Sequence, residues 1–168
     1  MINNNMNIRN RKFLLLALIV GVAAAVGACS RTSPTTALAF NTHADGLALR
    51  GFDAVAYFAV DNAVKGDPKF EYAWNGAKWL FSSEENMKKF RANPEAYAPQ
   101  FGGYCSFAVS EGYTADGDPE AWKIADGKLF LNYNKQVRGK WEKDQGARIE
   151  KGAANWKAFK TKKPEHKG

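Results

Sequence analysis

Cys105 is the side chain with the clearest capacity for chemistry in this sequence. It follows Gly102 and Gly103, which let the backbone turn tightly, and it precedes a stretch that predicts a short helix. A thiol near a helix N-terminus is favoured as the thiolate, which is the nucleophilic form. Burial beside Ala108 and Val109 would act in the opposite direction and make Cys105 a core residue. The sequence leaves both interpretations open.

Other residues typical of catalysis are sparse. The two histidines, His43 and His166, lie near what we expect to be loose ends of the folded domain. Glu84–Glu85 suits the first turn of a helix and Asp116–Asp118 suits a polar loop. No serine nucleophile elbow, phosphate-binding loop or metalloprotease motif is present. We therefore predict no catalytic residues and favour a binding protein over an enzyme.

Two further residues are candidates for ligand binding. Asp53 precedes a predicted short helix at Ala54–Phe58, so it either caps that helix or contacts a ligand. Tyr104 belongs to a set of aromatic residues that either fill the core or line a ligand pocket. The set comprises Tyr57, Tyr72, Trp74, Trp79, Tyr104, Tyr113, Trp122 and Tyr133. The candidate ligand-binding residues are thus Asp53, Tyr104 and Cys105.

Two tight turns define the elements that must position these residues. Asn75-Gly76 and Asp126-Gly127 each lie between short stretches of aromatic and branched residues. These dipeptides supply the positive φ angles of a type I′ turn, so each predicts a β-hairpin.

A helix is predicted after each hairpin. Ser82 and Glu85 match a capping box, and Pro94 ends the first helix. Asn134 is a natural cap for the second helix, which we expect to end at Gly146.

A C-terminal helix completes the predicted fold, with Ile149, Ala153 and Trp156 on its packed face. The two hairpin turns are 51 residues apart, which indicates either an internal pseudo-repeat or a chance similarity of two units. The predicted class is α+β: a small single domain with two β-hairpins, each followed by a helix, plus a C-terminal helix.

The N-terminal segment predicts export. Three basic residues within residues 9–12 precede an uncharged apolar run at 13–28, which is short for a membrane span and typical of a signal peptide. Val26-Gly27-Ala28-Cys29 resembles a bacterial lipobox, which predicts lipidation of Cys29; a soluble cut after Ala39 is the competing interpretation. Residues 1–28 are then the signal peptide and 29–45 a tether. We expect a lipid-anchored protein that faces the periplasm, with the outer membrane favoured.

The positive charge of the chain lies at its ends. The net charge is +7, and residues 157–167 alone carry five lysines and one glutamate. A nucleic-acid binder would carry this charge on its folded face, so nucleic acid is excluded as a partner. We interpret residues 158–168 as a basic tail, either a frayed solubilising terminus or a contact for anionic lipid.

Several segments together resemble a YHS domain, in particular the exported bacterial branch of that family. The resemblance covers residues 46–157 and implies a small α+β fold. It is carried by Gly51–Phe58, Trp74–Asn86, Phe90, Pro94, Tyr97 and Gly102–Cys105.

The wider family is associated with metals, usually through a Phe-Cys-Ser-x-x-Cys run. The matching run here is Phe81–Asn86, with Ser82 and Asn86 at both cysteine positions. Ala54 stands where the family often has proline. The metal association is therefore not carried over, and we expect no structural zinc.

These observations favour a binding or accessory module at the cell envelope. Its partner would be a small ligand, a soft metal ion such as copper near Tyr104 and Cys105, or an envelope protein. The alternatives are a thiol-based redox protein that uses Cys105 and a structural envelope lipoprotein.

Overall fold

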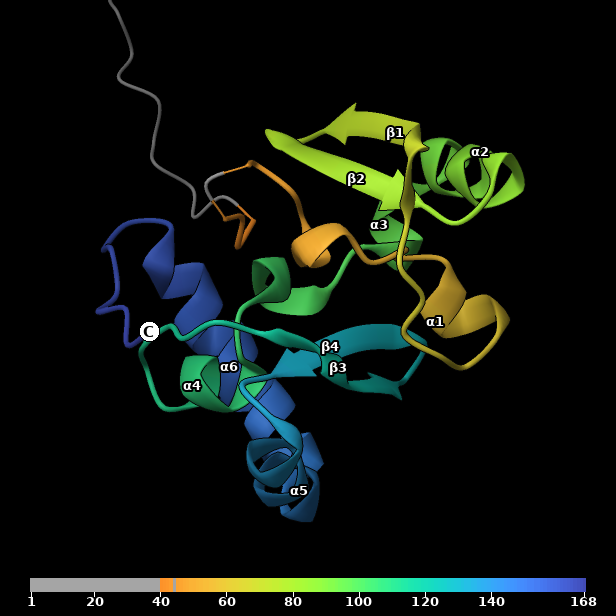
Figure 1. The fold of residues 1–168 in the computed structure, drawn as a ribbon. Helices are drawn as coiled ribbons and strands as arrows, with labels where there is room; N and C mark the ends of the chain where they lie inside the picture. Colours follow the sequence, from red (N-terminus) through yellow and green to blue (C-terminus); the bar gives the residue numbers. More distant parts are fainter. Residues whose placement is uncertain (1–39, 44) are drawn as a thin grey trace, which may run out of the picture. The chain divides into compact units, whose positions relative to one another are not determined.

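The computed structural model describes residues 40–43 and 45–168. The predicted signal peptide, Cys29 and nearly all of the tether lie outside these residues. The elements follow one another as predicted for an α+β domain (Figure 1). They are a 3-10 turn at Leu49–Gly51, α1 (Ala56–Ala59), β1 (Asp67–Trp74), β2 (Ala77–Phe81), α2 (Glu84–Ala92), α3 (Pro94–Tyr97), a 3-10 turn at Gln100–Gly103, α4 (Ser106–Ser110), β3 (Asp118–Ala125), β4 (Lys128–Asn132), α5 (Lys135–Lys143) and α6 (Gln145–Phe159).

Both predicted hairpins are confirmed. Strand β1 pairs antiparallel with β2, and β3 pairs antiparallel with β4. In the first turn Asn75 and Gly76 have φ of 48° and 77°; in the second, Asp126 and Gly127 have 49° and 68°. Positive φ at both central residues is what a type I′ turn requires, and its twist matches that of the flanking strands.

Each hairpin leads into a capped helix, with one correction to the prediction. Ser83, not Ser82, caps α2, because its side chain accepts a hydrogen bond from the backbone N–H of Asn86 at 3.1 Å. Ser82 lies one residue too early and has a different partner, described below. Asn134 caps α5 as predicted, accepting from the N–H of Val137 at 2.8 Å.

The two halves of the domain repeat the same local structure. Asp67 pairs with Phe81 and, 51 residues later, Asp118 pairs with Asn132. Each hairpin has its register shift at the same place, just after that pair. The capped helices α2 and α5 begin and end 51 residues apart. These agreements support an internal repeat over a chance similarity.

The repeat extends to the turn before each short helix. Three consecutive residues with positive φ occur at 49–51 and again at 101–103. After each of these turns the backbone N–H donates across to a loop carbonyl: Asp53 to Val64 at 2.8 Å, and Cys105 to Ala115 at 2.9 Å. Asp53 and Cys105 are therefore equivalent positions in the first repeat, residues 49–92, and the second repeat, residues 101–143.

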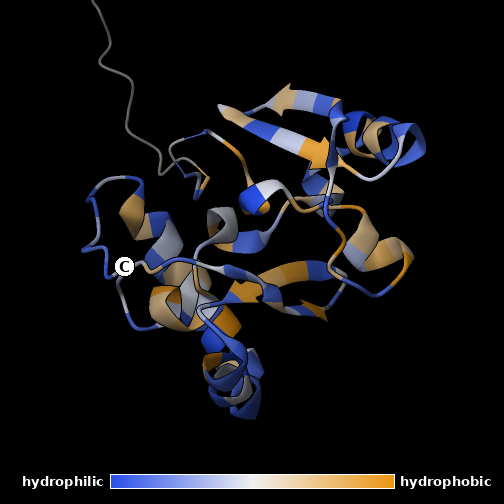
Figure 2. Ribbon diagram, in the orientation of Figure 1, coloured by the Kyte–Doolittle hydropathy of each residue, from blue (hydrophilic) through white to orange (hydrophobic). Residues whose placement is uncertain are grey.

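Strand β4 joins the two repeats into one domain. Leu129 and Leu131 pack into the same cluster as Trp79 and Phe90 of the first repeat. Phe130, on the opposite face of the strand, packs instead with Trp141 of α5. Figure 2 shows the apolar residues along β4, in contrast to the mostly hydrophilic α5. A strand buried on both faces cannot be separated from either repeat without exposing apolar surface.

Helices α5 and α6 meet at a different residue from the one predicted. The break falls at Asp144, and Gly146 lies inside α6. Ala153 is exposed, whereas Gly152 is buried against the ring of Phe101. A β-carbon at Gly152 would lie 2.8 Å from that ring, so any larger residue would have to displace the ring of Phe101. Ile149 and Trp156 pack on the core as predicted.

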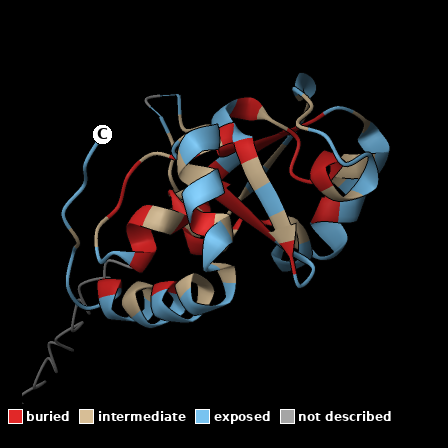
Figure 3. Cartoon of the chain, turned by 90° about the horizontal axis from the view of Figure 1, so that it is seen from below, coloured by how far each residue is buried: buried red, intermediate tan, exposed pale blue. Residues whose placement is uncertain are grey.

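The C-terminal tail is not frayed. Residue Thr114 forms a parallel bridge with His166, donating from its backbone N–H to Glu165 O and accepting from the N–H of Lys167, both at 2.8 Å. Most of this segment remains accessible to solvent (Figure 3). The tail therefore has a defined path across the surface. Within the described residues, no helix has the length and apolar character needed to cross a membrane.

Candidate functional site

Asp53 lies at the centre of a closed polar cluster in the first repeat. Its side chain is 0 % exposed. Oδ1 accepts hydrogen bonds from the backbone N–H groups of Val55 at 2.8 Å and Ala56 at 3.3 Å. Oδ2 accepts from the backbone N–H and hydroxyl of Ser82 at 2.8 and 2.6 Å, and from the side-chain amide of Asn86 at 2.7 Å.

This geometry gives Ser82 and Asn86 a common partner. Both side chains donate to the one carboxylate of Asp53. Five hydrogen bonds satisfy the two carboxylate oxygens, which leaves little capacity for a ligand. Asp53 thus orders the start of α1 and ties it to the start of α2, a structural role.

Cys105 occupies the equivalent place in the second repeat. Its side chain is 1 % exposed and packs against Ala108 and Ala115. Burial raises the pKa of the thiol, while the backbone N–H groups of Ala108, Tyr133 and Phe107 act weakly in the opposite direction. The first repeat aims the corresponding three N–H groups at the Asp53 carboxylate. In the second repeat the N–H of Phe107 donates instead to Oδ1 of Asn132 at 3.3 Å, and a protonated sulfur stands in place of the carboxylate.

Tyr104 and Cys105 belong to different surroundings although they are neighbours in sequence. Tyr104 lines an open surface pocket of about 460 Å³, which we call the Tyr104 pocket. That volume lies within the range usual for small-molecule sites. The pocket is lined by Asn41, Thr42, His43, Tyr104, Thr114, Asp116, Lys163, Pro164 and His166. It gathers residues from the start of the described chain, its middle and its C-terminal tail.

Arg50 organises one side of the Tyr104 pocket. Its Nε donates to Nε2 of His43 at 2.9 Å, and its Nη2 lies 3.5 Å from Oδ2 of Asp116. Since Nε2 of His43 accepts this bond, the ring carries its proton on Nδ1 and can donate from there. Asp116 is the one carboxylate lining the pocket and is already paired with a cation.

His166 and Thr114 form the other side. The hydroxyl of Thr114 donates to Glu165 O at 3.2 Å and lies 3.1 Å from Nδ1 of His166. Nε2 of His166 lies 3.6 Å from Oδ1 of Asp116. The tail is thereby fixed along the pocket wall, and Asp116 lies between Arg50 and His166.

Tyr104 supplies the aromatic wall of the pocket. Its ring lies 6.0 Å from those of both Trp156 and His166, measured between centroids. Partial burial raises the pKa of its phenol, and the nearby charge of Asp116 raises it further. The hydroxyl therefore stays protonated at neutral pH and remains a hydrogen-bond donor.

The structure does not bring the three sequence-predicted residues into one site. Asp53 and Cys105 are buried in separate repeats, and only Tyr104 faces a pocket. Sequence reasoning missed the others: His43 and His166 were expected at loose ends, and Asp116 in an unremarkable polar loop. They meet only because the tail folds back on Thr114, a contact that joins distant residues and leaves no local sequence signal.

Among the described residues, no group of three or more His, Cys, Asp or Glu side chains is placed to hold a metal ion. In the Tyr104 pocket, Nε2 of His43 already accepts from Arg50. The thiol of Cys105 is buried and does not line this pocket.

Comparison with known families finds a YHS domain at residues 55–101. The match covers α1, the first hairpin, α2 and α3, and includes Ser82 and Asn86. Searches of curated proteins and of solved structures find no match to the chain. A YHS domain is thus present from α1 to the start of the second repeat, while Tyr104 and Cys105 lie just beyond it.

Proposed function

We propose that this protein is a binding module, held at the bacterial cell envelope by a lipid on Cys29, that takes a small anionic ligand in the Tyr104 pocket. The observation that carries the ligand class is the balance of donors and acceptors in that pocket. His43, Tyr104 and Lys163 offer donors, whereas the single carboxylate, Asp116, is already engaged. A donor-rich pocket favours a carboxylate, phosphate or similar anion.

Lys163 is the residue we expect to contact the anion. It lines the pocket and takes part in none of the ion pairs formed within residues 40–43 and 45–168. Arg50 supplies a second positive charge, though one shared with Asp116. An anion at this point would complete the charge balance of the pocket.

The alternatives receive less support. A redox role for Cys105 needs an accessible thiolate, and the thiol is buried with a raised pKa. A soft metal ion between His43 and His166 would have to displace the bond from Arg50 to His43. A purely structural envelope protein gives no reason for this collection of polar side chains in one pocket.

A binding measurement with matched lysine variants tests the proposal. Inorganic phosphate and citrate are titrated by calorimetry into the wild type and into Lys163→Gln and Lys162→Gln. Lys162 is adjacent in sequence but does not line the Tyr104 pocket. We expect Lys163→Gln to weaken anion binding about tenfold or more, the typical worth of one charged hydrogen bond, and Lys162→Gln to leave it unchanged.

Two results would contradict the proposal. One is the absence of binding by either anion to the wild type; the other is an equal loss in both variants. A Cu²⁺ titration of the same proteins serves as the competing arm. Tight stoichiometric copper binding that is lost in His43→Ala and His166→Ala would replace the anion with a metal ion as the ligand.

A further inference from the structure

The C-terminal segment, residues 157–167, concentrates the positive charge of the folded chain. It carries five lysines and one glutamate, whereas residues 40–156 hold sixteen acidic and fifteen basic residues. All five lysines are exposed. Among the described residues only one of them, Lys167, forms an ion pair, with Glu165 at 3.4 Å. The other four lysines form no ion pair with any described residue; they are Lys157, Lys160, Lys162 and Lys163.

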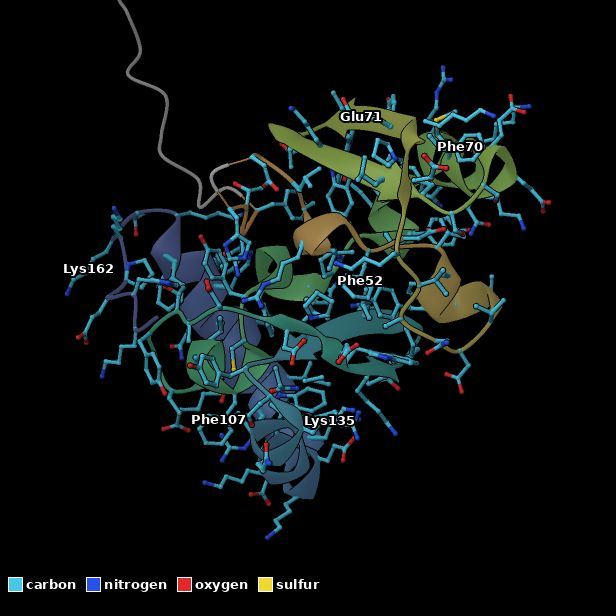
Figure 4. The ribbon with its side chains drawn as sticks, viewed as in Figure 1. Phe52, Phe70, Glu71, Phe107, Lys135 and Lys162 are labelled. Carbon is cyan, nitrogen blue, oxygen red and sulfur yellow. The ribbon has the colours of Figure 1, made fainter. Side chains whose placement is uncertain are left out.

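These lysines are presented at a fixed place. Lys157 and Lys160 lie at the end of α6, and the chain then turns back until His166 bridges to Thr114. The ammonium group of Lys167 lies 4.6 Å from the centroid of the Tyr113 ring, which further holds the segment down. In Figure 4 Lys162 lies at the margin of the molecule, away from Lys135 on α5.

The lysine segment lies beside the point where the described chain begins. Asn41 donates from its backbone N–H to Gly102 O at 2.8 Å and lines the same pocket as Lys163 and His166. Cys29 precedes Phe40 by eleven residues, which span at most about 40 Å when extended. A lipid at Cys29 would therefore hold this side of the domain within reach of the bilayer.

We propose that the lysine segment at residues 157–167 docks on an anionic lipid surface. Each lysine close to a negatively charged bilayer contributes about 1 kcal/mol of attraction. The compact, exposed ammonium groups match phosphatidylglycerol headgroups, which need no shaped pocket. This inference rests on the proposed lipid tether for its orientation but not for its binding energy. The tether would confine the domain to the membrane, and the lysines would orient it with the C-terminal segment towards the bilayer.

Vesicle sedimentation of residues 33–168 tests the docking without the lipid. The described part of this stretch, residues 40–43 and 45–168, forms one compact unit, and all of the buried core described above lies within it. Binding is measured at low ionic strength to vesicles of phosphatidylcholine with and without phosphatidylglycerol. The test variant carries Lys157→Glu, Lys160→Glu and Lys162→Glu, which leave the lining of the Tyr104 pocket intact. The matched control makes the same charge change on α5, with Lys135→Glu, Lys140→Glu and Lys143→Glu.

We expect the wild type to bind only the anionic vesicles, and salt to weaken the binding. The loss of three lysines corresponds to a reduction in affinity of about 100-fold or more, since about 1 kcal/mol for each lysine is a factor of about five at 1.4 kcal/mol per decade. The α5 control should retain most of the wild-type affinity. Circular dichroism confirms that both variants are folded.

Three outcomes would overturn the docking proposal: no binding of the wild type to anionic vesicles, equal binding to neutral vesicles, or equal loss in both variants. Binding of a short DNA duplex as tightly as the vesicles would also overturn it, because the segment would then be a general polyanion site. The anion titration with Lys163→Gln is independent of these results. Failure of the docking therefore leaves the ligand proposal standing, and the reverse also holds.

Discussion

At the scale of single residues, the two repeats place different side chains at the same buried position. In both repeats, backbone N–H groups at three matching positions lie near one buried side chain. The first places the carboxylate of Asp53 there, and the second places the thiol of Cys105. A carboxylate needs the donors that Ser82 and Asn86 add, whereas a protonated thiol does not.

The first residue-scale prediction concerns Asp53. We expect Asp53→Asn to destabilise the domain by about 2–3 kcal/mol, because an amide places N–H atoms against donors that need an acceptor. The matched control is Asp67→Asn, since the side chain of the exposed Asp67 accepts from the N–H of Lys69 and from no other described residue, and asparagine can accept the same bond. Urea unfolding of both variants measures the difference. Equal stabilities would mean that the Asp53 cluster contributes nothing to folding.

The second residue-scale prediction concerns the thiol of Cys105. Burial raises its pKa above the usual value of 9.0, so the folded protein keeps the proton at pH values where the unfolded chain loses it. Stability from this group is therefore complete below about pH 9 and falls as the pH rises further. We expect the stability difference between the wild type and Cys105→Ala to shrink over that range.

Alkylation checks the same thiol directly. Iodoacetamide should react with Cys105 only after denaturation, because the sulfur is 1 % exposed. The measurement uses Cys29→Ser so that one thiol is counted. Rapid alkylation of the folded protein near neutral pH would restore the redox interpretation.

The sequence could indicate which polar residues are candidates for a site, but not which of them lie close together in the fold. Asp53 meets Ser82 and Asn86 across about 30 positions, and Tyr104 meets His166 across about 60. Such contacts depend on how the elements pack, which periodicity and propensity do not encode. The burial of Cys105 was one of two open interpretations because its neighbours, Ala108 and Val109, suit either a core or a helix start.

At the scale of elements, sequence signals predicted the structure correctly where a residue type restricts the backbone φ angle. Asn75-Gly76 and Asp126-Gly127 form the predicted turns because few residues accept positive φ. Helix ends were less predictable. Both Ser82 and Ser83 can cap α2, and the choice falls on Ser83 because Asp53 engages Ser82. Gly146 lies inside α6 because the chain already turns at Asp144.

Glycine-to-alanine substitutions test the turns and the helices, because the same change should have opposite effects on stability in the two kinds of element. Gly76→Ala and Gly127→Ala should each destabilise by about 1 kcal/mol, since a β-carbon there meets no atom within 4 Å but φ is positive. Gly139→Ala in α5 also meets open space, yet there alanine should stabilise by about 1 kcal/mol through its helix propensity. Thermal unfolding measures both the decrease and the increase in stability. A stabilising Gly76→Ala would contradict the turn assignment.

At the scale of the whole molecule, β4 makes the two repeats interdependent. Its two faces belong to different clusters of the core, so loss of either cluster exposes the strand. We therefore regard the repeats as halves of one domain. The YHS match ends at Phe101, just where the second repeat begins.

The prediction at this scale is lipidation of Cys29. The protein isolated from membranes should begin at Cys29 with a diacylglyceryl modification, which mass spectrometry detects. Cys29→Ser should release the protein into the soluble fraction or leave it uncleaved. An unlipidated wild-type protein that begins at Phe40 would show that the anchor hypothesis is wrong.

The closeness of the two ends of the described chain has a consequence for engineering. Asn41 and His166 line one pocket, so a short flexible linker should join the ends without strain. New termini could then be opened at Asn75-Gly76 or at Asp126-Gly127, where the turns are exposed. Such circular permutants would cut the chain inside one repeat but keep the packing contacts of β4. Their folding rates would reveal which hairpin assembles first, because each cut removes the local connection of only one.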